Sequence, residues 1–416
     1  MATTVTTRPG AGGAASGKAG SSWTSARSTP SGPRQPRLRV DYTLLLMTAG
    51  LCAAGLLAVY SAGYNDRVLQ GIDPAKWAKR QGLFMGIGAV AMFAIMMIDY
   101  RRLRSWVPRF YVGTCGMMAL LPFLGTGVNG AKAWFSFGSF TLQPSEFAKI
   151  TLALMLATVV ANDRDGPLSY ARFVVSLLVL ALPTALIMLQ PDLGTASTFV
   201  VIAMAVLLVG RARVAHIALI SLLSLVSVVA LWKSGAVAEY QIARVTSFIK
   251  PQAAPTTGLP EAARKATDQI NAVRSEVRFS QQAVRLGGIR GQGFANGPTM
   301  NGNYVHEQRT DFVFATVAEQ FGLIGMAALL GLYLLVLFRL LRVAQLASDG
   351  FGALIASGAA AVLAWHIFEN VGMNMGIMPV TGIPLPLVSY GGSSTIAFMM
   401  MFGFVQNVYR HREAKS

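Results

Sequence analysis

The sequence predicts an all-α protein that crosses a membrane many times. Of its 416 residues, 53% are hydrophobic and only 13% are charged, whereas a soluble domain carries roughly 25% charged residues. The mean hydropathy is +0.51. Apolar runs of about twenty residues, the length of a helix that spans a bilayer, recur along the chain. These observations predict a polytopic bundle of about ten transmembrane helices, with one long loop before the eighth.

The bundle is expected to occupy residues 39–410. Its spans are predicted near 42–62, 82–98, 107–124, 145–161, 172–189, 195–209, 214–232, 312–338, 352–374 and 391–408. Residues 1–38 are rich in Gly, Ala, Ser, Thr and Pro, a composition that predicts a disordered tail. They also lack the apolar segment of a signal peptide. Residues 411–416 form a short C-terminal tail.

Positive charge predicts the orientation of the chain. The formal net charge is +17, and the basic residues fall mainly between apolar segments. That distribution is typical of cytoplasmic loops and argues against a nucleic-acid partner. An even number of spans then places both termini in the cytoplasm. The two cysteines, Cys52 and Cys115, lie inside apolar runs and predict neither a disulfide framework nor a metal cluster.

Four stretches on the outer side are unusual for loops: 125–146, 190–194, 233–311 and 375–394. Within the third, residues 259–286 show helical spacing of apolar residues and predict an amphipathic helix on the membrane surface. Its basic face either meets lipid phosphates or faces water. In the fourth, Pro and Gly interrupt an apolar run, and such backbone at membrane depth needs shelter from protein or a water-filled cavity.

Asp311 is the candidate catalytic residue. It stands where the polar segment ends and an apolar helix begins, and ionisable groups at membrane level are functional candidates. The alternative is that Thr310 and Asp311 only cap the helix that follows. Desolvation beside Phe312 would raise the pKa of Asp311 above its usual value of about 3.9 and make it a better general base. The neighbouring Arg309 would lower that pKa.

Other polar residues of these stretches each have two interpretations. Lys132 and Lys149 are either functional cations or anchors that reach the membrane surface. Asp192 either caps the helix after it or forms an ion pair with one of these lysines. The hydroxyl groups of residues 389–394 either line a cavity or satisfy the backbone of the interrupted helix.

Taken in order, the four stretches closely resemble the RodA/FtsW family, the SEDS membrane proteins of bacterial cell-wall synthesis. The matching pieces are Asn129-Gly130-Ala131-Lys132-Ala133-Trp134, Gln143-Pro144-Ser145-Glu146, Gln190-Pro191-Asp192-Leu193-Gly194-Thr195, Arg309-Thr310-Asp311-Phe312 through Glu319 and Gly322, and Pro384-Leu385-Pro386-Leu387-Val388-Ser389-Tyr390-Gly391-Gly392-Ser393-Ser394. The resemblance covers roughly residues 40–410. The segment 382–386 is more similar to the elongation member than to the division member.

Two positions depart from the pattern of the family. It usually has His where Arg309 stands and often Arg where Ala133 stands. An arginine cannot shuttle protons, so a mechanism assisted by histidine at this position is not expected. Lys132 would replace the missing arginine only as a point charge, without its bidentate fork.

The resemblance implies a glycosyltransferase of the bacterial cytoplasmic membrane. Such proteins polymerise glycan strands from lipid II on the outer face and act with a class B penicillin-binding protein. The 4-hydroxyl of lipid II attacks the growing strand, undecaprenyl pyrophosphate leaves, and the essential acidic residue falls on Asp311. The candidate substrate-binding residues are Lys132, Trp134, Gln143, Glu146, Lys149, Asp192, Arg309, Ser389, Tyr390 and Ser393. No cofactor is implied with certainty, and a divalent cation (Mg²⁺ or Mn²⁺) is left open.

Three other functions fit parts of this pattern. A lipid II flippase also has many spans and broken helices, but it should place charged groups along a path through the bundle. Here the polar motifs gather on the outer side, which favours chemistry at the surface. A scaffold that only recruits the crosslinking enzyme would not need Asp311. Within the family, a role in division is the alternative to elongation and cell shape.

Overall fold

The structure is a computed structural model. It describes residues 40–62, 64–69, 71, 73–128, 131–138, 140–161, 166–234, 239–249, 260–302, 304–305 and 307–412. The tail expected at 1–38 lies outside the described residues, as does most of the tail expected at 411–416.

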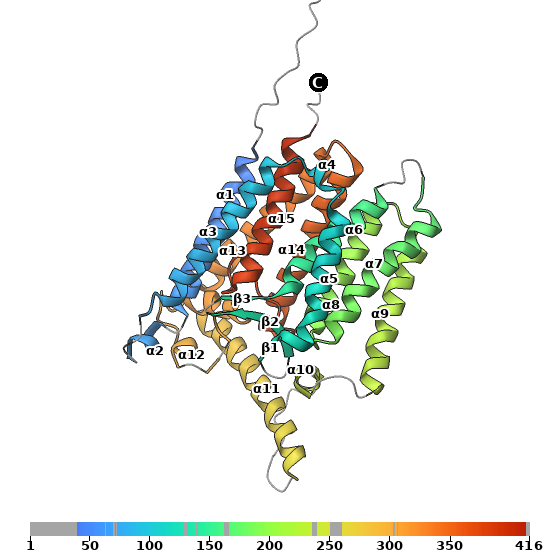
Figure 1. Cartoon of the computed structure of the whole chain (residues 1–416). Helices are drawn as coiled ribbons and strands as arrows, with labels where there is room; N and C mark the ends of the chain where they lie inside the picture. The colour runs from blue at the N-terminus through green and yellow to red at the C-terminus, as the bar shows by residue number, and fades with distance from the viewer. Residues whose placement is uncertain are drawn as a thin grey trace, which may run out of the picture. The chain divides into compact units, whose positions relative to one another are not determined.

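Within this part of the chain, ten long helices form a bundle (Figure 1). They are α1 (Tyr42–Ser61), α3 (Lys76–Met97), α5 (Val107–Leu124), α6 (Pro144–Val160), α7 (Tyr170–Met188), α8 (Leu193–Val209), α9 (Val214–Ser234), α13 (Val313–Leu346), α14 (Gly350–Asn374) and α15 (Gly392–Arg410). Each expected span coincides with one of them. The largest difference is at the end of α13, which lies at Leu346 rather than at residue 338.

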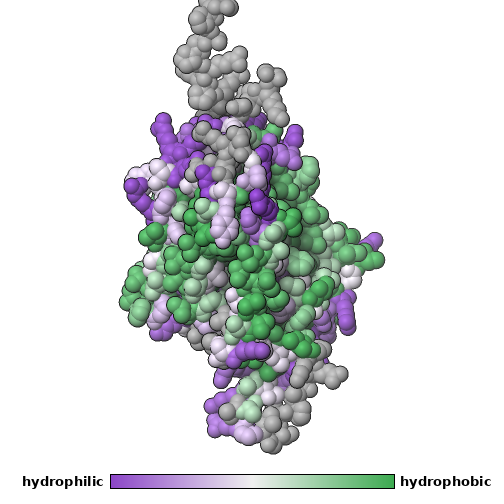
Figure 2. Space-filling model, turned by 90° about the vertical axis from the view of Figure 1, so that its right-hand side faces the viewer, coloured by the Kyte–Doolittle hydropathy of each residue, from purple (hydrophilic) through white to green (hydrophobic). Residues whose placement is uncertain are grey.

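The apolar surface of the bundle agrees with a membrane protein. Among the described residues, seven helices are long and apolar enough to cross a membrane: α1, α3, α5, α7, α9, α13 and α14. A shorter apolar helix, α8, adds an eighth candidate. Figure 2 shows a broad hydrophobic band between two hydrophilic ends. Leu222 and Val226 of α9 are more than half exposed, as expected for side chains that face lipid. The predicted fold class is therefore confirmed.

Shorter elements gather mainly at the end of the bundle opposite the C-terminus (Figure 1). They are α2 (Tyr64–Leu69), α10 (Glu239–Ile249), α11 (Glu261–Gly287), α12 (Pro298–Asn301) and a small antiparallel sheet of β1 (Thr126–Val128), β2 (Ala131–Phe137) and β3 (Phe140–Leu142), in the order β1-β2-β3. The remaining short helix, α4 (Tyr100–Leu103), lies at the other end. The sheet was not predicted from the sequence.

The helix predicted at 259–286 is α11, and its existence is confirmed. It contacts α10 and α13, and Ser280 and Ala283 are buried there. Figure 1 shows it extending beyond the end of the bundle. Its placement on a membrane surface stays a prediction.

A break in α13 fixes the position of α11. Gly322 has a φ of 63° inside α13, and a Cβ there would lie 2.4 Å from the backbone nitrogen of Gly291. The chain after α11 fills this break: Leu323 N donates to Gly288 O at 2.8 Å, and Gly293 N donates to Gln320 O at 3.0 Å. Only glycine combines this φ with so close a backbone approach. The start of α13, which follows Asp311, is thereby joined to α11.

Candidate active site

The outer stretches that the sequence singled out do meet at one end of the bundle. Gln143 N, at the start of α6, donates to Ser393 Oγ of α15 at 3.0 Å. Tyr390 N donates to Arg309 O at 2.8 Å, which joins the segment between α14 and α15 to the residues before α13. Residues more than 80 positions apart in the sequence therefore share one polar region.

Asp311 is held in this region through its backbone. Its carbonyl oxygen accepts hydrogen bonds from Asn370 Nδ2 at 2.9 Å and from Asn374 Nδ2 at 3.0 Å. These amides lie one turn apart on α14, so they point to the same side of that helix. Within the described part of the chain, the carboxylate of Asp311 accepts no hydrogen bond, which leaves its oxygens available to a substrate hydroxyl.

The capping interpretation of this stretch is wrong. The residue at the N-cap of α13 is Phe312, and within the described residues neither Thr310 nor Asp311 accepts a side-chain hydrogen bond from the first turn of the helix. Thr310 Oγ1 instead donates to Glu307 Oε2 at 2.8 Å. The start of α13 is stabilised from α14, because Asn374 Oδ1 accepts from Ala315 N at 3.1 Å.

Arg244 of α10 is the cation beside Asp311. Its Nη1 donates to Thr381 O at 3.0 Å. A Cβ built on Gly382, where φ is 78°, would lie 2.9 Å from Arg244 Nη1 and 3.5 Å from Asp311 Oδ2. The guanidinium and the carboxylate therefore face the same turn. The absence of a side chain at Gly382 keeps the space between them open.

Burial and the neighbouring charges raise the pKa of the Asp311 carboxyl. Burial raises the pKa of this carboxyl to about 6, Arg244 opposes that rise, and the carboxylates of Glu307, Glu276 and Asp192 add to it. The predicted upward shift by desolvation is confirmed. The opposing cation is Arg244, while the same effect expected of Arg309 stays a prediction.

Arg309 instead packs on an aromatic pair. Its guanidinium carbon lies 5.3 Å from the centroid of the Trp77 ring, and the Tyr390 ring meets the same indole edge-on at 5.0 Å. Burial raises the pKa of Tyr390, and the charges of Arg80 and Arg309 lower it. Arg309 and Tyr390 thus form one surface with α3.

Ser389 and Ser393 serve the backbone. Ser389 Oγ donates to Thr310 O at 2.5 Å and accepts from Leu385 N at 2.8 Å. Ser393 Oγ accepts from Gln143 N and donates to Thr141 O at 3.1 Å. For these two serines the structure shows the backbone-satisfying alternative, and they hold the segment before α15 in place.

The predicted residues of the sheet, Lys132 and Trp134, form their described hydrogen bonds to groups other than Asp311. Lys132 of β2 is exposed, and its Nζ donates to Pro122 O at 3.1 Å. Trp134 of β2 is half-buried, and its carbonyl accepts from Thr126 Oγ1 at 3.1 Å. Because Lys132 Nζ forms no ion pair and no other hydrogen bond within the described residues, it remains available as a surface cation.

Glu146 and Lys149 form a buried pair in α6. Their charged atoms are 2.6 Å apart, and the residues are 4% and 3% exposed. Lys149 Nζ also lies 3.2 Å from His366 Nε2, while His366 Nδ1 lies 3.2 Å from Pro384 O. The expectation that Lys149 acts as a cation at the membrane surface was therefore wrong, because it needs its buried partner to offset desolvation.

Asp192 caps α8. Its carboxylate accepts from Thr195 N at 2.9 Å and from Thr195 Oγ1 at 2.7 Å. In the described residues it pairs with neither Lys132 nor Lys149, so the capping alternative is the correct one. The turn also approaches the site closely, since a Cβ on Gly194 would lie 2.9 Å from Thr381 O.

A large apolar groove ends at this site. Its volume is about 790 Å³, and side chains of α7, α8 and α9 such as Leu180, Val200 and Val228 line it. At its polar end lie Asp192 and Arg244. The groove therefore connects the membrane-facing surface of the bundle with the cation beside Asp311.

A divalent cation stays a prediction, because Mg²⁺ is usually held by one or two carboxylates together with substrate phosphates. Across the described ranges, no three side chains of His, Cys, Asp or Glu are grouped so that they could hold one. The described residues therefore offer a divalent cation no site built from three such side chains.

The family model of the FtsW, RodA and SpoVE proteins, described as "Cell cycle protein", matches residues 42–414. This chain belongs to that family. The chain is 35% identical to the stage V sporulation protein E of Bacillus subtilis over 375 residues, which is 89% of this chain and 97% of the relative. It is 31% identical to the peptidoglycan glycosyltransferase MrdB of Escherichia coli over 380 residues, or 91% and 96% of the two chains.

Solved structures of the FtsW/RodA/SpoVE family share the fold. One is a chain from a peptidoglycan synthase complex that coordinates polymerization and crosslinking; it has a TM-score of 0.71 and 30% identity, with 91% of this chain and all of that chain covered. Another is the rod shape determining protein RodA of Thermus thermophilus, with a TM-score of 0.63 and 28% identity, covering 91% and 99%. Sporulation, elongation and division proteins match at 30–35% identity, so these comparisons assign the family and not the member.

Sequence reasoning missed three residues of the site in this family member. Arg244 lies in α10, where Tyr240, Arg244 and Phe248 recur every four residues, the spacing of one helix face. Asn370 and Asn374 show the same spacing inside an apolar span, where polar side chains are functional candidates. Both patterns are visible in the sequence, but neither identifies Asp311 as the partner.

Proposed function

We propose that this protein polymerises lipid II into glycan strands. The observation that carries the proposal is the Asp311 carboxylate, which has a raised pKa and faces Arg244 across Gly382 at the polar end of an apolar groove. A general base works best when its pKa is close to the operating pH. Relatives that bear the name peptidoglycan glycosyltransferase support the assignment.

In the proposed step, Asp311 accepts the proton of the 4-hydroxyl of GlcNAc in lipid II. The hydroxyl oxygen forms a bond to the anomeric carbon of MurNAc at the end of the growing strand. The bond between that carbon and the pyrophosphate oxygen breaks, and undecaprenyl pyrophosphate leaves with the bonding electrons. Arg244 offsets the charge that develops on the leaving group.

The groove gives the lipid a place during this step. Its walls are mainly apolar, and its polar end reaches Arg244. A polyprenyl chain in the groove would bring its pyrophosphate to the guanidinium, because charge-assisted hydrogen bonds favour arginine beside phosphate. Lys132 forms no described hydrogen bond to Arg244 or Asp311, and it is proposed only as a surface cation.

The orientation, role and partner belong to the same proposal. The basic loops support a cytoplasmic position for both termini, which would put Asp311 on the outside of the bacterial cytoplasmic membrane. A role in elongation is supported by the segment 382–386, which resembles the elongation member. A class B penicillin-binding protein is the proposed partner, supported by the similarity to a chain of a synthase complex.

The test is polymerisation of labelled lipid II by the purified protein with its partner. Asp311→Asn removes the base but keeps the side-chain volume, and its expected loss is roughly 10²–10⁴-fold in rate. Folding and partner recovery should be unchanged, since the Asp311 backbone rather than its carboxylate is hydrogen-bonded to α14. Normal polymerisation by this variant would overturn the assignment of the base. Movement of lipid II across vesicles without polymer would instead identify a transporter.

A further inference from the structure

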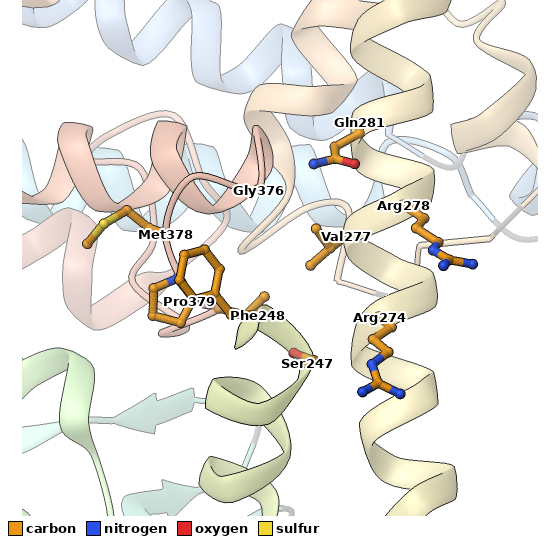
Figure 3. Close-up of a pocket in the computed structure, with 10 residues that line it drawn as sticks. Ser247, Phe248, Arg274, Val277, Arg278, Gln281, Gly376, Met378 and Pro379 are labelled. Carbon is orange, nitrogen blue, oxygen red and sulfur yellow. The ribbon is translucent and has the colours of Figure 1, made fainter. Parts of the chain in front are cut away.

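A second cavity lies outside the Asp311 site, between α10, α11 and the segment after α14. Its volume is about 260 Å³, and its lining includes Ser247, Phe248, Arg274, Val277, Gln281 and Pro379. Figure 3 shows Ser247 and Phe248 on the side of α10 that faces α11, with Val277 and Gln281 projecting from α11 toward the turn that carries Pro379. The cavity combines apolar walls with the charges of two arginines, Arg274 and Arg278.

Arg274 is a buried cation that pairs with no carboxylate among the residues that the structure describes. It is 6% exposed. Its Nη1 donates to the neutral amide oxygen of Asn271 at 2.9 Å, and its Nε is buried without a hydrogen-bond partner. No carboxylate of the described residues forms an ion pair with it, and the connection 250–259 contains no Asp or Glu. Burying a charge without a counter-ion costs free energy, and a bound anion would offset that cost.

Other cations of the same helix differ from Arg274. Arg264 pairs with Asp268 at 3.9 Å, and Lys265 pairs with Glu261 at 2.9 Å. Those side chains are largely exposed, where water would solvate them even without a partner. The helix therefore supplies carboxylates to the cations that need them least. The buried guanidinium is left with an unused donor beside a cavity.

The side chains that line the cavity fit an organic ligand that carries a carboxylate. A guanidinium prefers planar oxyanions, which it binds through parallel N–H donors. Phe248, Val277 and Pro379 form apolar walls, which suit the carbon skeleton of a ligand better than a hydrated inorganic ion. The amide of Gln281 adds a polar group to fix orientation.

The cavity adjoins the site described above. Pro379 and Val380 line both this cavity and the large groove, and Ser247 Oγ donates to the carbonyl of Arg244 at 2.7 Å. A substrate whose lipid fills the groove and whose pyrophosphate meets Arg244 would extend its remaining parts toward this cavity. In a lipid II molecule bound there as the donor of the first transfer, those parts are the sugars and an acidic peptide.

We propose that Arg274 binds a carboxylate of the peptide carried by lipid II, as a subsite separate from the Asp311 centre. The assignment rests on the proposed function, because it takes lipid II as the ligand. Arg274 is then a specificity-determining residue that recognises the ionised peptide and takes no part in bond formation.

The experiment compares lipid II that has free peptide carboxylates with lipid II in which they are amidated. Binding of each is measured on the full-length protein with its partner, in an Asp311→Asn background that does not turn over. Arg274→Gln should weaken binding of the free-carboxylate form roughly tenfold, the scale of a hydrogen bond to a charged group, and leave the amidated form unchanged. Arg264→Gln, on the same helix but exposed, is the matched control and should change neither. Thermal unfolding should show Arg274→Gln to be at least as stable as the parent, since it removes an unpaired buried charge.

Three results would overturn the proposal. If the parent and Arg274→Gln bind the free-carboxylate and amidated forms equally well, Arg274 does not form a subsite for the peptide carboxylate. Equal weakening of both forms would assign Arg274 to the pyrophosphate. Loss of partner recovery without a change in lipid II binding would assign it to a protein interface. Normal polymerisation by Asp311→Asn would refute the proposed base, whereas the three results above bear only on the Arg274 subsite.

Discussion

Replacing Arg244 by glutamine should raise the pH at which polymerisation begins. Asp311 acts as a base only when it is ionised, and its pKa is about 6. The parent rate should therefore fall about tenfold for each pH unit well below 6. A neighbouring cation favours the ionised carboxylate and lowers its pKa, so removing that cation raises it. The variant should need a more alkaline solution to reach its full rate.

The size of the shift follows from the geometry at Gly382. The distances of 2.9 Å to Arg244 Nη1 and 3.5 Å to Asp311 Oδ2 place the two charged atoms within about 6.5 Å of each other, where the Coulomb energy is about 2.5 kcal/mol at an effective dielectric constant of about 20. That energy equals roughly two pKa units. Because Asp311 is only partly buried, solvent screening reduces the expected shift to about one unit. The midpoint of the acid limb should move from about 6 to about 7.

The assay is the initial rate of lipid II polymerisation between pH 5 and 9 for the parent, Arg244→Gln and the control Arg264→Gln, roughly the range in which a base of this pKa titrates. The control should keep the midpoint of the parent. Arg244→Gln should also show a lower plateau, since it loses a cation for the leaving pyrophosphate. A midpoint that stays in place or moves to lower pH would refute the electrostatic coupling of these two residues.

Two further predictions concern the support of the site. Asn374→Ala removes the donor to Asp311 O and the acceptor for Ala315 N, so thermal unfolding should show a loss of roughly 1–3 kcal/mol; a stability equal to that of the parent would contradict this role. Ala196→Trp places an indole in the apolar groove, so KM should rise for polyprenyl lipid II and change little for a short-chain analogue, whereas Val226→Trp on the exposed face of α9 should leave both unchanged. Equal effects on the long and short substrates would exclude the groove as the lipid site.

The bundle could be predicted because its signal is long and local. An apolar run of about twenty residues has few alternatives to a membrane helix, and every expected span coincides with a helix. Asp311 could be found for a related reason. Its position at the start of such a run predicts partial desolvation, and the pKa of about 6 agrees with that expectation.

The partners of Asp311 could not be predicted because they come from distant segments. Arg244 precedes it by 67 residues and Asn374 follows it by 63, and no periodicity within either segment encodes their approach. The prediction of an exposed Lys149 was wrong because local sequence does not show the packing between helices. Its position near the start of α6 suggested exposure, but packing against α14 buries it beside Glu146 and His366.

The division of hydrogen bonds at Asp311 explains how one residue can be both fixed and reactive. The asparagines of α14 bond to its carbonyl oxygen, so they position the residue without changing the basicity of its side chain. Hydrogen bonds to the carboxylate itself would have favoured the ionised form and lowered its pKa. Instead, a charge across an open turn tunes that pKa from a distance. Substitutions at Asn374 and Arg244 should therefore have different effects. A change at Asn374 should alter the stability and the rate but leave the pH midpoint of the rate in place. A change at Arg244 should move that midpoint.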